Sequence, residues 1–370
     1  MKPDQGLPSA RRVVVKIGTN ALTKSSGGFH RGHLETLAAA LKDAARDREL
    51  LIVSSGAIAL GVERLKLAAR PKDVPGKQAC AAVGQSRLMA AWEAALAPRV
   101  VAQVLLTHDD VQDRRRYLNA RHALERLLDS GVIPVINEND TVSADEIKLG
   151  DNDRLAGLVA TLVGADALII LSDVDGLYDA DPRKNPGAKR LAHVERITPD
   201  IVELAGGTSG AGTGGMATKI RAAAHVTEAG VRCVIASGQD AETLPKLFAG
   251  ESVGTHFAPR KDRRAARAGW IAHALKARGK LEVDDGARKA VLERNKSLLP
   301  SGIRAVKGNF GAGDPVDLVD SSGAAFARGL ACYPSDELQR IAGKKTSAIE
   351  ATLGYRGTDE AVHRDDLVLL

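Results

Sequence analysis

The sequence predicts an α/β protein with an open, mainly parallel sheet sandwiched by helices, followed by a small β-rich C-terminal domain. Short apolar runs alternate with longer amphipathic segments over the first two thirds of the chain, and this alternation is typical of parallel βαβ units. Hydrophobic residues make up 44% of the sequence but aromatic residues only 3%. The core must therefore consist mainly of Val, Ile, Leu and Ala, as in sheets that are buried on both faces.

We predict strands where apolar runs end in glycine or polar turns, and helices where apolar residues recur with a helical period. The predicted strands cover 12–19, 50–53, 99–107, 132–136, 167–171 and 231–236, and the predicted helices cover 33–48, 76–96, 114–129, 151–163 and 216–229. In the second domain we expect β-like runs at 302–306, 316–319 and 324–331, with a possible edge strand at 365–370. The expected division is a first domain at 8–256, a basic linker at 257–279 and a second domain at 280–370.

Chain length and cysteine content narrow the class of protein. A chain of 370 residues is long enough for two domains with separate cores. Cys80, Cys233 and Cys332 lie far apart with no CxxC spacing, which argues against a disulfide framework or a zinc site and for a reducing compartment. The sequence shows no signal peptide and no apolar run of about 18 residues that could span a membrane. We expect a cytoplasmic protein that does not enter a membrane.

The net charge of +6 is concentrated in one segment. Residues 257–280 contain eight Lys or Arg and one Asp, a local balance of +7 that leaves the rest of the chain at about −1. A basic segment of this kind either binds nucleic acid or forms a solvated, anion-contacting linker. The segment alone does not decide between these two interpretations.

Two polar clusters follow predicted strands and are the first candidates for a site. Asn137–Asp140 comes directly after the apolar run 132–136, and Asp151–Asp153 opens the helical pattern that follows. In open α/β sheets, ligands bind beyond the carboxyl ends of the strands. Short carboxamides and carboxylates there suit a small polar ligand with an ammonium group, or a hydrated metal. The alternative is a simple turn followed by a helix N-cap, because Asn and Asp favour both.

Two further strand ends carry polar groups. Lys16 interrupts the apolar run 12–19 near its end, where its ammonium could reach the crevice above the sheet or merely extend to solvent. The run 50–53 stops in Ser54–Ala57, which opens a helix. Backbone N–H groups and a serine hydroxyl at a helix N-terminus can bind a carboxylate, although an ordinary serine cap has the same sequence.

A glycine-rich segment at 206–215 leads into the predicted helix 216–229, which carries Lys219. Residues 210–215 fit GxGxxG formally, but no strand directly precedes them, as a dinucleotide fingerprint would require. No glycine directly precedes Lys219, so the segment is not a P-loop either. A loop of this kind at a helix N-terminus could still wrap phosphates, and a plain flexible linker is the alternative.

Six motifs together resemble the bacterial glutamate 5-kinases of the amino acid kinase superfamily. They read VVVKIGTN, IVSSGAIALG, INENDTVS, LGDNDRLA, LSDVDGLYDADPR and GTGGMATKIRAA, in that order. Related kinases for other acceptors tend to carry KxGG or KFGGT where this chain has Lys16 followed by Ile-Gly-Thr. Asn20 and Ser172 depart from the Ser and Thr that are common in the family, but both remain small and polar. The segment GKLEVDDGARKAVLERNKSLLPSGI and the residues after it are similar to a PUA domain.

The resemblance implies the amino acid kinase fold and a role for each matching residue. Lys16 and Lys219 would neutralise the transferring phosphoryl group, and Asp153 would hold both ammonium groups. Gly18 and Gly56 would let backbone N–H groups come close to anions. The residues implied to bind glutamate are Ser55, Asn137, Asp140 and Asn152, and those implied to bind the nucleotide are Lys16, Gly18, Ser172, Asp173, Thr213, Gly214, Gly215, Met216, Ala217, Thr218 and Lys219.

The implied reaction is phosphorylation of the L-glutamate side-chain carboxylate by ATP with Mg²⁺, as the first step of proline biosynthesis. No metal ligand can be assigned from the sequence. The resemblance also implies proline as a feedback inhibitor, a glutamyl phosphate reductase as a possible partner, and a homo-oligomer, either a dimer or a tetramer. The alternative is an RNA-binding protein that acts through the basic linker and the PUA-like domain. That domain, however, offers few aromatic side chains for base stacking: Phe310, Phe326, Tyr333 and Tyr355.

Overall fold

The computed structural model describes residues 6–23, 28–143, 152–182, 184–206, 215–259 and 277–370. Residues 112 and 114 are described only through their backbone. The chain forms two compact units, each with its own sheet and its own core. The sheet of the larger unit ends with residue 257 and that of the smaller unit begins with residue 279.

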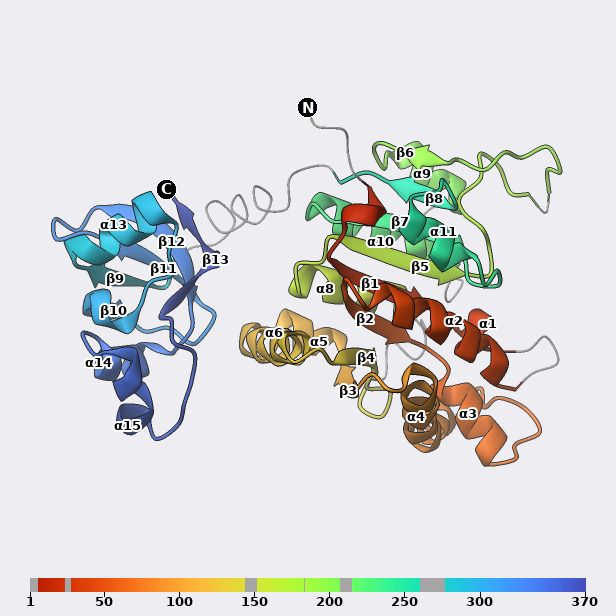
Figure 1. Ribbon diagram of the computed structural model, residues 1–370, viewed down its shortest axis with the longest axis horizontal. Coiled ribbons are helices and arrows are strands. Elements are labelled where there is room, and N and C mark those ends of the chain that lie inside the picture. Colours follow the sequence, from red (N-terminus) through yellow and green to blue (C-terminus); the bar gives the residue numbers. More distant parts are fainter. Residues whose placement is uncertain (1–5, 24–27, 144–151, 183, 207–214, 260–276) are drawn as a thin grey trace. The chain divides into compact units, whose positions relative to one another are not determined.

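The larger unit contains an eight-stranded sheet in the order β3-β4-β2-β1-β5-β7-β8-β6 (Figure 1). The first six strands of this order are all parallel, which confirms the predicted open, mainly parallel sheet. Strand β8 runs antiparallel to β7, and β6 pairs with β8. The bounds are β1 Arg12–Ile17, β2 Glu49–Ser54, β3 Val101–Leu106, β4 Ile133–Glu138, β5 Ala167–Ser172, β6 His193–Val194, β7 Arg232–Ser237 and β8 Thr255–Phe257.

Strands β6 and β8 were not predicted from the sequence. They contain only two and three residues, so neither shows the sustained apolar run by which a strand can be recognised. Their place at the sheet edge depends on pairing between segments that are far apart in the chain. The apolar runs at both positions were therefore too short for a strand to be predicted.

Helices cover both faces of the larger sheet, as predicted. On one face, α2, α4 and α11 pack against alternate residues of β1, β2 and β5, while α8 and α10 contact the sheet on the opposite face. The described helices between residues 19 and 249 are α1 Thr19–Leu22, α2 Arg31–Ala44, α3 Ala57–Arg64, α4 Val74–Leu96, α5 His108–Gln112, α6 Arg114–Asp129, α8 Asn152–Leu162, α9 Pro199–Leu204, α10 Met216–Glu228 and α11 Thr243–Ala249.

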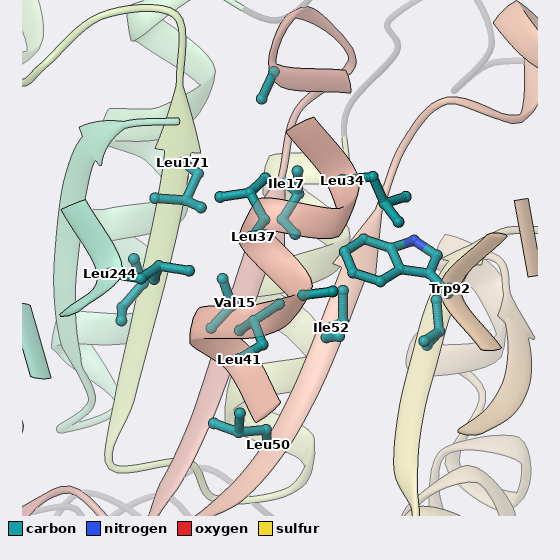
Figure 2. Packing of buried hydrophobic residues seen from close by; sticks show 14 of the residues in the cluster. Val15, Ile17, Leu34, Leu37, Leu41, Leu50, Ile52, Trp92, Leu171 and Leu244 are labelled. Carbon is teal, nitrogen blue, oxygen red and sulfur yellow. The ribbon is translucent and has the colours of Figure 1, made fainter. Parts of the chain in front are cut away.

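The alternation of β1 places its lysine on the α8 and α10 face. Val15 and Ile17 are fully buried in the core against α2, together with Leu37, Leu41 and other aliphatic side chains (Figure 2). Successive side chains of a strand point to opposite faces. Lys16, which lies between these two residues, therefore points toward α8 and α10.

The smaller unit is a five-stranded sheet in the order β10-β9-β11-β12-β13 (Figure 1). Neighbouring strands are antiparallel, except that β11 runs parallel to β9. The C-terminal strand β13 lies at the edge, which confirms the possible edge strand. The bounds are β9 Gly279–Val283, β10 Ile303–Gly308, β11 Pro315–Val319, β12 Ala325–Ala331 and β13 Val362–Leu369, with helices α13 Asp285–Arg294, α14 Ser335–Ile341 and α15 Ile349–Leu353.

Within the part of the chain that the structure describes, no helix combines the length and the apolar character needed to cross a bilayer.

Candidate active site

The carboxyl ends of the central parallel strands carry most of the polar residues singled out in the sequence. Lys16 is the fifth residue of β1, Ser55 directly follows β2, Asn137 lies near the end of β4, and Ser172 is the last residue of β5. Because the strands are parallel, these ends meet at one edge of the sheet. The two polar clusters and the lysine strand end are therefore neighbours in space.

Asp153 binds both predicted lysines at once. Its Oδ1 lies 2.5 Å from Lys16 Nζ, and its Oδ2 lies 3.1 Å from Lys219 Nζ. Thr218 Oγ1 also donates to Oδ2, at 2.8 Å. Asp153 is only 1% exposed, and the two lysines are 6% and 4% exposed. The alternative in which Lys16 merely extends to solvent is wrong.

This buried cluster has a clear electrostatic character. Burial by itself would raise the pKa of Asp153, but the ammonium groups of Lys16 and Lys219 outweigh it and hold the pKa below its usual value. The carboxylate is therefore ionised at neutral pH. The three groups together carry one more positive than negative charge, which favours an anionic ligand beside them.

A second cluster consists of neutral polar side chains. Asn152 Nδ2 donates to Ser55 Oγ at 2.7 Å and to Asn137 Oδ1 at 3.0 Å. Asn137 Nδ2 in turn donates to Gln85 Oε1 at 2.9 Å. The structure thus brings together three of the residues predicted to bind glutamate. It adds Gln85 of α4, which the sequence analysis missed because no local pattern distinguishes it within a helix.

The turn interpretation of the first polar cluster applies to part of it. The carbonyl of Asn139 accepts from the backbone N–H groups of Val142 and Ser143, and its side chain accepts from Thr141 Oγ1 at 2.7 Å. Asn139 therefore builds the turn, whereas Asn137 belongs to the amide cluster.

Asp140 lies in the same turn and has a strongly perturbed carboxyl group. Burial raises its pKa to about 6, although the positive charge of Arg70 acts in the opposite direction. Perturbed carboxyl groups of this kind gather at functional sites. A cationic partner such as an ammonium group would stabilise the ionised form.

Ser172 and Asp173 form a further polar group at the end of β5. Asp173 accepts hydrogen bonds from Asn20 Nδ2 at 2.9 Å and from Ser172 Oγ at 3.0 Å. Partial burial would raise the pKa of Asp173, but these hydrogen bonds lower it below its usual value. Gln239 Nε2 donates to the Asn20 carbonyl at 2.9 Å and links this group to the end of β7.

Two glycines leave room at the strand ends. A Cβ on Gly18 would lie 3.3 Å from Lys16 Nζ, and the Gly18 N–H donates to the Leu171 carbonyl. Gly56 precedes α3 with φ at 115°, a left-handed conformation that side chains disfavour. A side chain at Gly18 would crowd the Lys16 ammonium group, and a side chain at Gly56 would meet Phe29 at 3.2 Å.

The glycine-rich segment is described only at its end. Thr213 and Gly214 lie outside the described residues. Gly215 is the N-cap of α10, and Met216 and Ala217 form its first turn. Thr218 and Lys219, the third and fourth residues of the helix, donate to Asp153.

Within the described ranges, no group of three or more His, Cys, Asp or Glu side chains could hold a metal ion. Asp153, the most buried carboxylate of the site, is already bound by two ammonium groups. These residues therefore do not fit a metal site built by the protein.

Comparisons with known proteins show the family of the chain. The model of the amino acid kinase family matches residues 11–237, well over half of the chain. The chain belongs to the amino acid kinase family. The PUA domain model matches residues 279–353, in agreement with the resemblance of the smaller unit.

Curated members of this family resemble the chain over its whole length. The glutamate 5-kinase of Myxococcus xanthus is 64% identical, with 98% of this chain and 97% of that protein covered. The glutamate 5-kinases of Anaeromyxobacter dehalogenans and Geobacter sulfurreducens are 53% and 47% identical, with 98% of this chain and 97% and 99% of those proteins covered. These matches confirm the resemblance to glutamate 5-kinases. They do not favour the alternative of a protein whose main activity is RNA binding.

Proposed function

We propose that this chain transfers the γ-phosphoryl group of ATP to the side-chain carboxylate of L-glutamate, giving L-glutamate 5-phosphate and ADP, the first step of proline biosynthesis. The observation that carries the proposal is the pair of lysines, distant in sequence, that converge on one buried carboxylate. The full-length similarity to proteins named glutamate 5-kinase supports the choice of acceptor.

The reaction needs cations and alignment more than it needs a base. A glutamate side chain has a pKa of about 4.3 in water and is already the nucleophilic anion at neutral pH. The difficulty is that an anionic oxygen must approach an anionic phosphoryl group. Lys16 and Lys219 would offset this repulsion as charge moves toward the leaving oxygen, while Asp153 keeps both ammonium groups in place.

The two substrates would occupy opposite sides of the lysine pair. Ser55, Asn137 and Asn152 would contact glutamate through neutral hydrogen bonds, and Asp140 would pair with its α-ammonium group. The nucleotide would lie along Ser172, Asp173 and the segment from Thr213 to Lys219. Holding two substrates in line in this way can contribute on the order of 7 to 11 kcal/mol to lowering the barrier.

Mg²⁺ would enter as part of the ATP complex, bound by the phosphates, because the described residues do not fit a protein-built metal site. Its charge would add to that of the lysines. We further propose proline as a feedback inhibitor, a glutamyl phosphate reductase as consumer of the product and a homo-oligomeric assembly, since the family resemblance implies all three.

The test is a hydroxamate assay with ATP and Mg²⁺, which traps the acyl phosphate product. We expect product from L-glutamate, and little from N-acetyl-L-glutamate, which lacks the ammonium group, or from L-aspartate, which is one methylene shorter. A preference for N-acetyl-L-glutamate or L-aspartate would refute the proposed acceptor.

The same assay tests the lysines. Lys16→Ala and Lys219→Ala should lower kcat about 100-fold or more, with smaller effects on KM, because their charge matters most as the phosphoryl group moves. Unfolding midpoints should be measured alongside, since removing one partner of a buried ion pair also destabilises the fold. A folded Lys219→Ala variant with unchanged kcat would contradict the assigned role.

A further inference from the structure

Helix α4 packs directly against the end of β2 and the start of α3, on either side of Ser55. A Cβ on Gly84 would lie 1.8 Å from the carbonyl oxygen of Ala57, so the backbones of α3 and α4 are in contact there. Two turns later, Trp92 Nε1 donates to Ser54 Oγ at 2.9 Å. Gln85, the residue after Gly84, is therefore held at a fixed place relative to Ser55.

Gln85 is one end of a chain of side-chain amides that runs through the amino-acid site. Its Oε1 accepts from Asn137 Nδ2, and Asn137 Oδ1 accepts from Asn152 Nδ2. Asn152 Nδ2 also donates to Ser55 Oγ. These four side chains come from α4, β4, α8 and the loop after β2, so the chain of hydrogen bonds joins four elements of the fold.

The hydrogen bonds give the chain of amides a direction. Each carboxamide has an oxygen that only accepts and a nitrogen that only donates. Once Gln85 presents its oxygen, Asn137 must turn its nitrogen toward Gln85 and its oxygen toward Asn152. Asn152 then uses its nitrogen for both bonds. The two atoms left without a partner among the described residues are Gln85 Nε2 at one end of the amide chain and Asn152 Oδ1 at the other.

An unpartnered oxygen in this place calls for a ligand. Asn152 is only 8% exposed, and a buried acceptor without a donor is costly. The α-ammonium group of an amino acid supplies such a donor, and the carboxyl group of Asp140 in the neighbouring turn would offset its charge. An acceptor at this position would be lost if the chain of amides ran in the opposite direction.

We propose that Gln85 is a positioning residue of the amino-acid site: through Asn137 it orients Asn152, so that Asn152 Oδ1 accepts a hydrogen bond from the α-ammonium group of the substrate. This inference rests on the proposed function and adds a residue to it. Gln85 acts here through its oxygen and does not itself contact the substrate.

Two substitutions distinguish the role of the Gln85 oxygen from that of its nitrogen. Gln85→Glu keeps an acceptor and removes the donor, whereas Gln85→Met has a similar length and removes both. We expect Gln85→Met to raise the KM for L-glutamate about tenfold, which corresponds to one hydrogen bond near 1.4 kcal/mol, with kcat and the KM for ATP little changed. Gln85→Glu should remain close to the wild type. A Glu variant as impaired as the Met variant would overturn the proposal.

A second measurement distinguishes positioning from a general structural role. Glutarate has the acceptor carboxylate of L-glutamate but no ammonium group, so it cannot use Asn152 Oδ1 as proposed. Gln85→Met should reduce the preference for L-glutamate over glutarate, measured as the ratio of kcat/KM values, about tenfold. An equal loss with both acceptors would mean that Gln85 only supports the fold and would also overturn the proposal.

Gln103→Met is a matched control, because Gln103 is exposed on β3. Its kinetic constants and unfolding midpoint should match the wild type. A wild-type protein that fails to phosphorylate L-glutamate would refute the proposed function itself, whereas an active wild type with an unaffected Gln85→Met variant would refute only the role of Gln85.

Discussion

Asp140 carries the clearest pH signal of the site. Its carboxyl group has a pKa of about 6 because it is partly buried, whereas an unperturbed Asp titrates near 3.9. Only the ionised form can pair with the α-ammonium group of glutamate. If Asp140 pairs with the α-ammonium group as proposed, its protonation competes with substrate binding in a pH range where kinetics can be measured.

The KM for L-glutamate should fall as the pH rises through about 6 and then level off. The sign follows because the raised pKa keeps Asp140 protonated below about pH 6, and that proton must leave before the ammonium group binds. Below this pH we expect up to about a tenfold increase in KM per pH unit. Steady-state kinetics between about pH 5 and pH 7.5 provide the measurement.

Asp140→Asn is the control for this pH dependence, since it keeps the size of the side chain and removes the titration. Its KM for L-glutamate should be high and nearly independent of pH over the same range. A variant that retained the wild-type pH profile would show that another group is responsible, such as a phosphate of ATP.

At the scale of elements, the contact between α3 and α4 holds the substrate side of the site. Gly61 lies so close to Cys80, and Gly84 so close to Ala57, that a Cβ on either glycine would be 1.8 Å from a backbone carbonyl oxygen. Backbone atoms cannot yield as the end of a flexible side chain can. The two glycines therefore permit the close packing that brings Gln85 next to Asn137.

Gly84→Ala should force the two helices apart. We expect a loss of about 1 to 3 kcal/mol in the free energy of unfolding, as is typical of overpacking, together with a higher KM for L-glutamate. Urea unfolding and steady-state kinetics give the two measurements.

Gly157→Ala is a matched control in helix α8, where an added Cβ would meet its nearest neighbours at 3.6 Å. Alanine is a better helix former than glycine by roughly 0.5 to 1 kcal/mol. This variant should be as stable as the wild type or more so. Equal destabilisation by both substitutions would mean that the close α3–α4 contact is not the cause.

At the scale of the whole molecule, the two units have separate hydrophobic clusters that share none of the described residues. One lies on the α2, α4 and α11 face of the eight-stranded sheet, and the other fills the five-stranded unit. The lysines, Asp153 and the amide chain all belong to the larger unit. Ligands of this site should therefore stabilise that unit directly.

Calorimetry should show whether ligands stabilise the larger unit more than the smaller one. L-Glutamate with a non-hydrolysable ATP analogue should raise the midpoint of the transition that belongs to the larger unit, by mass action. Trp92 is fully buried in that unit. The sequence contains one other tryptophan, Trp270, so in a Trp270→Phe variant the fluorescence of Trp92 identifies the transition of the larger unit. A shift that appears only in a transition not reported by Trp92 would contradict the placement of the site.

The α/β class, the family, the positions of most strands and those of the five longest described helices follow from the sequence alone. These features depend on local patterns: apolar runs form strands, helical periods form helices, and polar residues at strand ends indicate a candidate ligand site. Even α6 has the range predicted for it, Arg114–Asp129, because its apolar period is regular. Each of the six motifs consists of residues that are close together in the chain.

Which distant side chains meet could not be read from local sequence patterns. Lys16 and Lys219 are separated by more than half of the chain, and their shared carboxylate on α8 follows from the order of strands in the sheet. Gln85 lies within an ordinary helical pattern and gains its role only through the contact of α4 with α3 and Asn137. Local patterns reflect the burial and backbone preferences of neighbouring residues, whereas pairing between distant groups depends on how the whole sheet is assembled.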